Sequence, residues 1–171
     1  DLAVAVGEGS TIHVKSGTSA WKALSNAPGL LPVSFQGVWG KKTSNGYTLW
    51  LAASGASSTE KNLWKIDIVQ AGMGWTSLTK DSWSWGTEDL YAVWGDGTTI
   101  WAAGKNAIVK GRSDGTKELL FNFPGESFWA ITGVAGNPDS VRVAGDLGVF
   151  GYVPFAGLGS GASAGSWVLQ N

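Results

Sequence analysis

The sequence predicts an all-β fold built from repeated four-stranded antiparallel units. Helical periodicity is missing, and short apolar runs alternate with stretches of glycine, serine, asparagine, aspartate and proline. The run Gln-Gly-Val-Trp-Gly at residues 36–40 returns as Tyr-Ala-Val-Trp-Gly at 91–95 and more loosely as Trp-Ala-Ile-Thr-Gly at 129–133. A second apolar run follows each copy, so the chain repeats a pair of short strands.

The second run also opens the chain, so its copies can be aligned on their last residue. It ends at Gly7, Ala53, Gly104 and Gly145, which places the copies 46, 51 and 41 residues apart. Repeats of about 40–50 residues that hold several short strands are typical of β-propeller blades. We therefore expect a propeller domain, or a segment of a larger propeller, with repeats at residues 1–34, 35–89, 90–127 and 128–171.

Each repeat divides into four strands joined by short polar turns, such as those at Glu8, Lys105 and Asp146. First strands are expected at 35–40, 90–95 and 128–133, second strands at 2–7, 48–53, 99–104 and 140–145, third strands at 10–15, 61–68, 106–112 and 148–153, and fourth strands at 21–25, 75–79, 117–122 and 167–170.

The first repeat lacks its innermost strand, because the chain opens on a second strand. One interpretation is a four-bladed ring with a defective first blade. The other is an incomplete ring, which further blades, a second fragment or another copy of the chain complete. We favour the incomplete ring, because an unpaired inner strand edge is costly and attracts other strands.

Composition excludes several classes of function. The chain has 12 basic and 13 acidic residues, and its basic residues form no cluster larger than Lys41-Lys42, so no nucleic-acid partner is expected. Cysteine is absent, and no apolar run approaches the roughly 20 residues of a spanning helix. The chain opens on Asp1 without an initiator methionine or signal peptide, so we expect a mature or excised segment. A surface that is polar but poorly charged favours a secreted protein.

Residues for catalysis are scarce. The only histidine, His13, lies within an expected strand, and one histidine cannot supply the cluster of ligands that a metal site needs. A Ser-His-Asp triad would have to use His13, and no Gly-x-Ser-x-Gly nucleophile elbow is found in a strand–turn–helix setting. The acids Glu88, Asp89, Glu118 and Glu126 are interpreted as surface groups rather than as a glycosidase pair. We therefore expect no catalytic residue, no metal and no cofactor.

The 11 tryptophans fall into two groups. Nine recur at fixed strand positions, which predicts wedges that fill the space between neighbouring sheets. Trp83 and Trp85 instead lie in an insertion at residues 80–88 that no other repeat shares. The wedge group consists of Trp21, Trp39, Trp50, Trp64, Trp75, Trp94, Trp101, Trp129 and Trp167.

The loops from second to third strands and from fourth to first strands open on the same face, because antiparallel strands alternate in direction. Insertions on such a face favour recognition. We therefore predict a contact site for a sugar or an extended peptide on this face, while a plug over the end of the ring is the alternative. The predicted site comprises Trp83, Trp85, Glu60, Asp81 and Glu88.

The sequence resembles the Trp-rich propeller repeats of bacterial secreted and envelope proteins, which are distant relatives of the Asp-box repeats of sialidase-like propellers. The segments that carry the resemblance are Val-Trp-Gly at 93–95, Ile-Trp-Ala-Ala-Gly at 100–104 and Ser-Asp-Gly-Thr at 113–116. Thr132 and Arg142 stand where the pattern has tryptophan. Sialidase-like enzymes need three clustered arginines, whereas this chain has two, which argues against that activity.

The sequence therefore favours a non-catalytic binding module of a secreted or envelope protein, with a glycan or a protein as its ligand. The alternatives are part of a glycan hydrolase or lyase whose catalytic residues lie partly outside this segment, and a structural assembly component.

Overall fold

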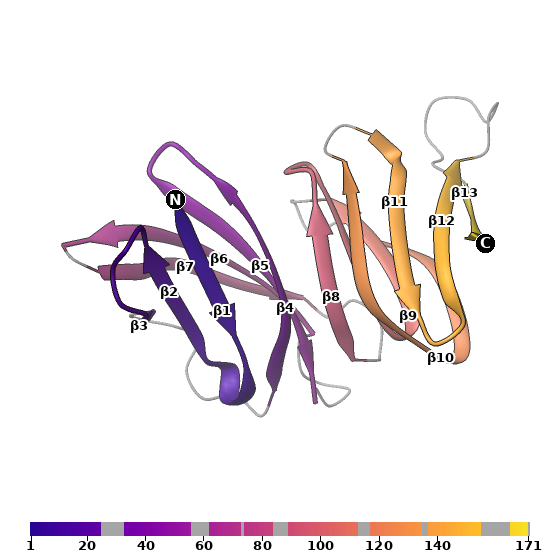
Figure 1. Cartoon of the computed structure of the whole chain (residues 1–171), viewed down its shortest axis with the longest axis horizontal. Coiled ribbons are helices and arrows are strands. Elements are labelled where there is room, and N and C mark those ends of the chain that lie inside the picture. The colour runs from indigo at the N-terminus through magenta and orange to yellow at the C-terminus, as the bar shows by residue number, and fades with distance from the viewer. Residues whose placement is uncertain are drawn as a thin grey trace.

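The chain forms an all-β structure of three antiparallel sheets (Figure 1), which confirms the all-β part of the predicted fold class. The structure, a computed structural model, describes residues 1–24, 33–55, 62–72, 74–83, 89–112, 117–134, 137–154 and 165–170. Within these ranges the one helical segment is a short 3-10 turn, η1 (Glu8–Ser10).

The first sheet has three strands in chain order, β1 (Leu2–Val6), β2 (Ile12–Ser16) and β3 (Lys22–Ala23). The turn between β1 and β2 passes through η1, where Gly9 adopts the left-handed region with φ of 59°. β1 lies at the edge of this sheet, with β2 as its one strand partner in the described chain. The sheet therefore begins with a second strand, as predicted, although β3 is shorter than the expected strand at residues 21–25.

The second sheet has four strands in chain order, as the repeat pattern predicts for residues 35–89. Its last strand continues to Trp83, so residues 80–83 belong to a strand and not to the expected loop. The extension forms because Trp83 still pairs with Leu63 and Asp81 with Lys65. The strands are β4 (Ser34–Lys42), β5 (Gly46–Ser54), β6 (Leu63–Ala71) and β7 (Gly74–Trp83).

The third sheet has six strands, but its hydrogen-bonded ladders form two groups that divide within β10. Residues 117–122 of β10 pair with β9, which pairs with β8, whereas residues 128–134 pair with β11, which pairs with β12. The two groups correspond to the predicted units at residues 90–127 and 128–171. The elements β9 and β10 each contain two of the predicted strands. β9 folds back at the predicted turn, because the Nζ atom of Lys110 lies 5.0 Å from the centroid of the Trp101 ring, whereas nine residues of extended strand would span about 30 Å. The bounds are β8 (Leu90–Gly95), β9 (Thr99–Arg112), β10 (Lys117–Val134), β11 (Asn137–Gly145), β12 (Gly148–Pro154) and β13 (Gly165–Gln170).

Both long strands change partners along their length, because each of them combines two of the predicted strands. β9 pairs with β8 up to Gly104 and with β10 from Lys105 onward, and Asn106 there has φ of 60°. β10 pairs with β9 up to Ser127 and with β11 from Phe128. Asparagine tolerates the left-handed region better than most residues, so the chain can reverse direction at Asn106 in a tight turn.

Three buried clusters hold the sheets together. The first lies between the first and second sheets and includes Val14, Phe35 and Ile66. The second joins the second sheet to β8 and β9 through Trp50 and Leu90. The remaining cluster lies between β9 and the ladder of β10 with β11, and comprises Trp101, Ala103, Ile108, Phe128, Val141 and Val143.

The wedge prediction is confirmed for the tryptophans of the second strands. Trp50 and Trp101 are 2% and 1% exposed, each within a cluster that joins two parts of the structure. Their first-strand partners are Trp39, which pairs with Trp50, and Trp94, which pairs with Trp101. These two partners are half-buried and pack against the same clusters. They therefore act as wedges, but one side of each ring is exposed to solvent.

The wedge prediction is wrong for Trp21 and Trp129, which are 48% and 57% exposed. Trp21 precedes the two-residue strand β3, and Trp129 lies at an irregularity of β10. The sheets also do not close on one another within the described residues, because the first sheet and the β12–β13 edge lie at opposite ends of the structure (Figure 1).

Candidate functional site

The predicted contact site falls largely beyond the described residues. Trp85, Glu60 and Glu88 lie outside the described ranges. The backbones of Asp81 and Trp83 lie in β7, and the description does not extend to their side chains. A site at Trp83 and Trp85 therefore stays a prediction.

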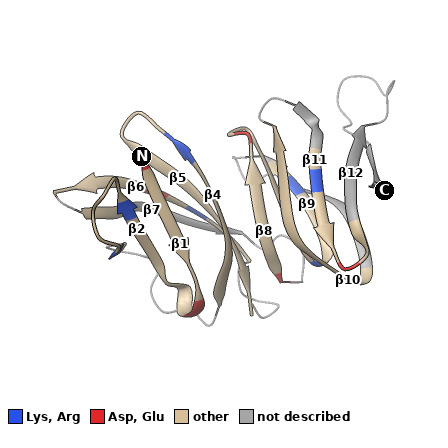
Figure 2. Ribbon diagram, viewed as in Figure 1, with Lys and Arg blue, Asp and Glu red and all other residues tan. Residues whose placement is uncertain are grey.

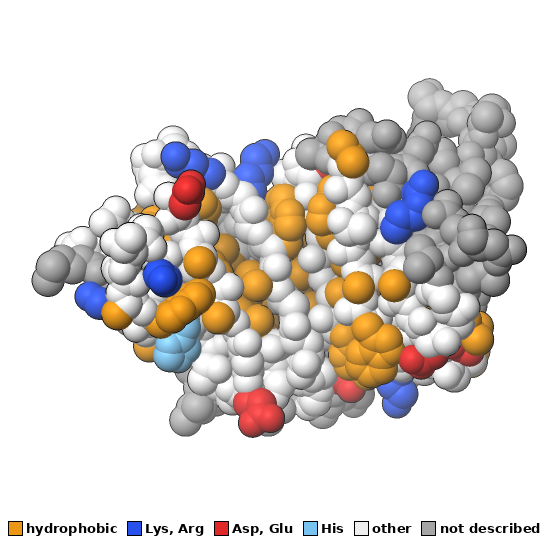
Figure 3. All heavy atoms as spheres, viewed as in Figure 1, with side chains coloured by type: hydrophobic (Ala, Val, Ile, Leu, Met, Phe, Trp, Pro, Cys, Tyr) orange, Lys and Arg blue, Asp and Glu red, His pale blue; other side chains and the backbone are white. Residues whose placement is uncertain are grey.

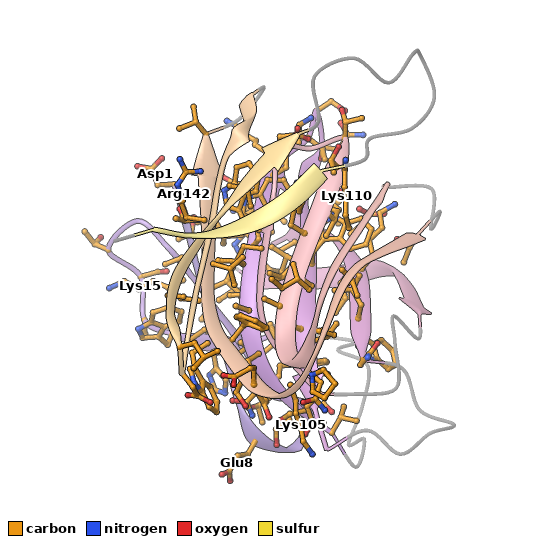
Figure 4. The ribbon with its side chains drawn as sticks, turned by 90° about the vertical axis from the view of Figure 1, so that its right-hand side faces the viewer. Asp1, Glu8, Lys15, Lys105, Lys110 and Arg142 are labelled. Atoms are coloured by element: carbon orange, nitrogen blue, oxygen red, sulfur yellow. The ribbon has the colours of Figure 1, made fainter. Side chains whose placement is uncertain are left out.

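The face on which this site was predicted is nevertheless formed. The backbone amide of Gly55 donates to the Oδ1 atom of Asp89 at 2.7 Å, and the amide of Lys105 donates to the carbonyl oxygen of Asp89 at 2.9 Å. Gly55 and Lys105 follow second strands, and Asp89 precedes a first strand. The two classes of loop therefore meet at one end of the structure, as predicted. Glu8 and Lys105, which both follow second strands, also lie toward the same end in Figure 4.

The described residues at this end contain a feature that sequence periodicity did not predict. All three copies of the first strand carry a register irregularity at the same repeat position, at Gln36 in β4, Tyr91 in β8 and Trp129 in β10. A bulge inserts one unpaired residue and re-aims its side chain, and bulges are frequent beside functional sites. We call Gln36, Tyr91 and Trp129 the bulge row.

Two members of the bulge row form an aromatic stack. The rings of Tyr91 and Trp129 lie 4.6 Å apart between centroids, with an angle of 9° between their planes. The indole Nε1–H of Trp129 donates to the Oδ1 atom of Asp146 at 2.8 Å. The stack and the hydrogen bond fix the indole in position, and its 57% exposure means that a large part of it stays open to solvent.

The third member of the bulge row, Gln36, forms a hydrogen bond equivalent to the one between Trp129 and Asp146. The Nε2 atom of Gln36 donates to the Oγ atom of Ser54 at 2.8 Å, and Gln36 is exposed. Ser54 and Asp146 occupy equivalent positions, each directly after a second strand. The copies of Gln36 and Trp129 thus share a bond from the bulged side chain to the residue after the predicted second strand.

The surroundings of the bulge row are polar without being strongly charged. Asp146 and Lys105 are exposed near the stack, and charged side chains are scattered over the described ribbon (Figure 2). A patch of large hydrophobic side chains is open to solvent near the lower end of β8 in the space-filling view (Figure 3). The site therefore offers one rigid aromatic surface with hydrogen-bonding groups at its rim.

Other candidates from the sequence have structural roles. His13 is exposed on β2 and pairs across to Ala5. Asp96 accepts hydrogen bonds from the amides of Thr98 and Thr99, both at 2.8 Å, and so stabilises the turn between β8 and β9. Among the described residues no group of three or more histidine, cysteine, aspartate and glutamate side chains is placed to hold a metal ion.

Sequence reasoning assigned Trp129 to the wedge group because it lies in a first strand. The signal that separates it is alignment: Trp129 aligns with Gln36 and Tyr91, whereas the wedges Trp39 and Trp94 align with Thr132. A repeat position occupied by glutamine and tyrosine is not a core position. That signal was available in the sequence.

Comparison of the chain with protein-family models, with curated proteins and with solved structures found no match. No helix in the described part of the chain is long and apolar enough to cross a membrane.

Proposed function

We propose that this chain is a non-catalytic carbohydrate-binding module and that the Tyr91–Trp129 stack is its contact surface. The observation that carries the proposal is the exposed indole of Trp129, which is held between Tyr91 and Asp146. Proteins seldom leave a large, immobilised aromatic ring open to water without a contact role. The resemblance to secreted and envelope repeats supports the same class of function and location.

The chemistry of the surface favours a sugar ring. The face of an indole ring is electron-rich, so it attracts the weakly positive C–H groups that line one face of a pyranose. Asp146, Gln36 and Ser54 add hydrogen-bonding groups for hydroxyls at the rim. An ordered indole also loses little conformational entropy on binding.

We further propose that the sheets are adjacent blades of an open propeller arc. The first-strand copies support this arrangement, because β4 packs beside β8 and β8 packs beside β10 without sharing a hydrogen-bonded ladder. Innermost strands of neighbouring blades are expected to stand in this way around a common axis. The bulge row then lies along the inner rim of the arc.

A glycan array tests the carbohydrate proposal, with Trp21→Ala as the matched control. Trp21 is similarly exposed, at 48%, but takes part in neither the bulge row nor its hydrogen bonds. We expect the unmodified chain and Trp21→Ala to bind the same glycans. Trp129→Ala is expected to lose about tenfold or more in affinity, which corresponds to about 1.4 kcal/mol. Full retention of glycan binding by a folded Trp129→Ala variant would overturn the proposal.

The predicted contacts Trp83 and Trp85 are tested in the same array. β7 ends at Trp83, and the chain returns at Asp89 to the loops that meet at the end of the bulge row. A double variant, Trp83→Ala with Trp85→Ala, is expected to weaken the binding of glycans longer than one ring. Unchanged affinity for every glycan would remove these two residues from the site.

A structural assembly role is the second candidate, and the open face of Trp129 favours it. A further repeat would place its own bulged residue where the next member of the row belongs, beyond Trp129. Measurement of the mass in solution distinguishes the two functions, since assembly predicts association that Trp129→Ala weakens.

A further inference from the structure

The junctions between first strands share one contact, in which a tryptophan lies on a glycine. The Cζ3 atom of Trp39 lies 3.0 Å from where a Cβ atom would stand at Gly95. The Cη2 atom of Trp94 lies 2.8 Å from the same point at Gly133. Gly95 and Gly133 both end the Val-Trp-Gly pattern of their own copies. Each tryptophan therefore needs a glycine in the next first strand, because any side chain there would collide with the indole.

Gly40 is the equivalent glycine of the second sheet, and it carries no tryptophan. Around Gly95 the nearest groups are Ile100, the carbonyl oxygen of Thr99 and the ring of Trp39. Around Gly40 two of these have counterparts, Leu49 at 2.9 Å and the carbonyl oxygen of Thr48 at 3.4 Å. No described residue supplies the third. Gly95 is buried, whereas Gly40 is exposed.

A hollow of about 240 Å³ opens at this place, between β1 and the second sheet. Most of the residues around it have apolar side chains, while polar atoms form about half of its exposed wall. Hydrophobic side chains are visible between β1 and the centre of the molecule in Figure 3. The lining consists of Leu2, Val4, Val38, Gly40, Tyr47 and Leu49.

The strand edge beside the hollow is open as well. β1 pairs with β2 along one side, and no described strand pairs with its other side. An open edge presents backbone donors and acceptors to which another strand can bind. The hollow and the edge therefore adjoin, and one extended segment can fill both.

We propose that this edge and hollow form a docking site for an extended strand of a partner polypeptide that carries the pattern Val-Trp-Gly. The other two junctions specify this occupant, because each of them holds a tryptophan of that pattern on the glycine that corresponds to Gly40. A second copy of the chain is a poorer occupant, since its described first strands, β4, β8 and β10, already pair within their own sheets.

The register of the docked strand follows from the repeat. Trp39 pairs with Trp50, and Val4 is the equivalent of Trp50 in the first sheet. The tryptophan of the partner strand therefore lies opposite Val4 with its ring on Gly40. Its valine then lies opposite Ala5 and its glycine opposite Ala3, antiparallel to β1.

A synthetic peptide with the sequence of residues 89–97 tests the site in trans. Gly7 and Asp1 bond toward β2, so by alternation the amides of Ala3 and Ala5 face β2 and those of Leu2, Val4 and Val6 face the open edge. We expect the peptide to bind the chain and to protect the amides of Leu2, Val4 and Val6 from hydrogen exchange. The same peptide with Trp94→Ala is expected to bind at least tenfold more weakly. Because this change is made in the peptide, it leaves the fold of the protein intact.

Two variants of the protein complete the test. Gly40→Val fills the hollow at an exposed position and is expected to weaken peptide binding at least tenfold. Thr132→Val, on the exposed face at the other end, is the control and is expected to bind as the unmodified chain does. Equal binding of the peptide and its Trp94→Ala form, or peptide binding unaffected by Gly40→Val, would overturn the proposal. So would a stable dimer in which the amides of Leu2, Val4 and Val6 are already protected without peptide.

Discussion

Two cross-strand pairs at the same repeat position have opposite character. Trp94 pairs with Trp101 between β8 and β9, and Thr132 pairs with Arg142 between β10 and β11. The Trp pair packs against the cluster between β9 and β11, with Trp101 1% exposed. Thr132 is exposed and Arg142 half-exposed, on a face that no described sheet covers. Arg142 is visible on this outer side of the third sheet in Figure 4.

The difference shows that the position in the repeat determines the face toward which a side chain points. Whether a neighbouring sheet covers that face determines whether the residue is apolar or polar. A Trp pair is favourable only when another sheet removes its apolar surface from water. Thr132 and Arg142 look like departures from the sequence pattern, yet they are the residues that an uncovered face requires. Both positions change together because they are opposite each other on one face.

The largest loss of stability is expected from truncation of the Trp94–Trp101 pair, which we call the covered pair. Trp101→Ala removes a fully buried side chain and is expected to lower the free energy of unfolding by about 3–5 kcal/mol. Arg142→Ala, at the equivalent position, is expected to lower it by about 1 kcal/mol or less. Chemical denaturation measures both. Equal destabilisation by the two variants would contradict the comparison.

The glycine beneath each wedge gives the next test. Gly95→Ala places a methyl group against Ile100, Thr99 and Trp39 and is expected to cost about 1–3 kcal/mol through overpacking. At Gly40 only Leu49, a flexible side chain, and a more distant carbonyl oxygen stand nearby, so Gly40→Ala is expected to change stability by about 0.5 kcal/mol or less. Similar losses at both glycines would show that the wedge contact is unimportant.

The stack in the bulge row is expected to contribute less than either wedge. A double-mutant cycle with Tyr91→Ala and Trp129→Ala measures the coupling between the two rings directly. Stacked aromatic pairs give about 0.5–1.5 kcal/mol beyond their burial, and we expect a value in this range. A coupling energy of zero would mean that the rings do not form the observed contact in solution.

The smallest change in monomer stability is expected when the exposed pair Thr132–Arg142 is replaced by two tryptophans. Thr132→Trp combined with Arg142→Trp adds apolar surface that no sheet covers, so the free energy of unfolding should change by only about 0.5 kcal/mol. The exposed apolar patch should instead promote association. Sedimentation at several concentrations detects it. A variant that stays monomeric and gains stability would indicate that this face is covered in the chain itself.

Much of the fold followed from the sequence because the strands are short, apolar and punctuated by turn residues. The second sheet has the predicted four strands in order, and the predicted wedges Trp50 and Trp101 are buried. Their fixed spacing from a small residue identified them. Within the described residues β1 also has no partner strand on its inner edge, in agreement with the prediction that the sequence opens on a second-strand copy.

The remaining features of the structure could not be predicted from the alternation of side chains along a strand, which repeats every two residues. A bulge at Trp129 breaks the alternation of faces, so a residue counted as core points to solvent. The positive φ of Asn106 lies at the turn within β9, which the sequence predicted, but the bridge between Lys105 and Ser127 that links the ladders there was not predicted. The stack of Tyr91 on Trp129 joins side chains from two strands and required three-dimensional placement.

The most direct test is a solvent paramagnetic relaxation experiment on the indole N–H signals of the tryptophans. A soluble gadolinium complex broadens signals according to their exposure, so one spectrum compares covered and uncovered positions together. The signals of Trp50 and Trp101 should stay sharp, because these side chains are 2% and 1% exposed. Trp129 and Trp21, at 57% and 48%, should broaden strongly, and Trp39 and Trp94 should lie between. A Trp129 signal as sharp as that of Trp101, or a broadened Trp101, would contradict the proposed division between covered wedges and an exposed contact surface.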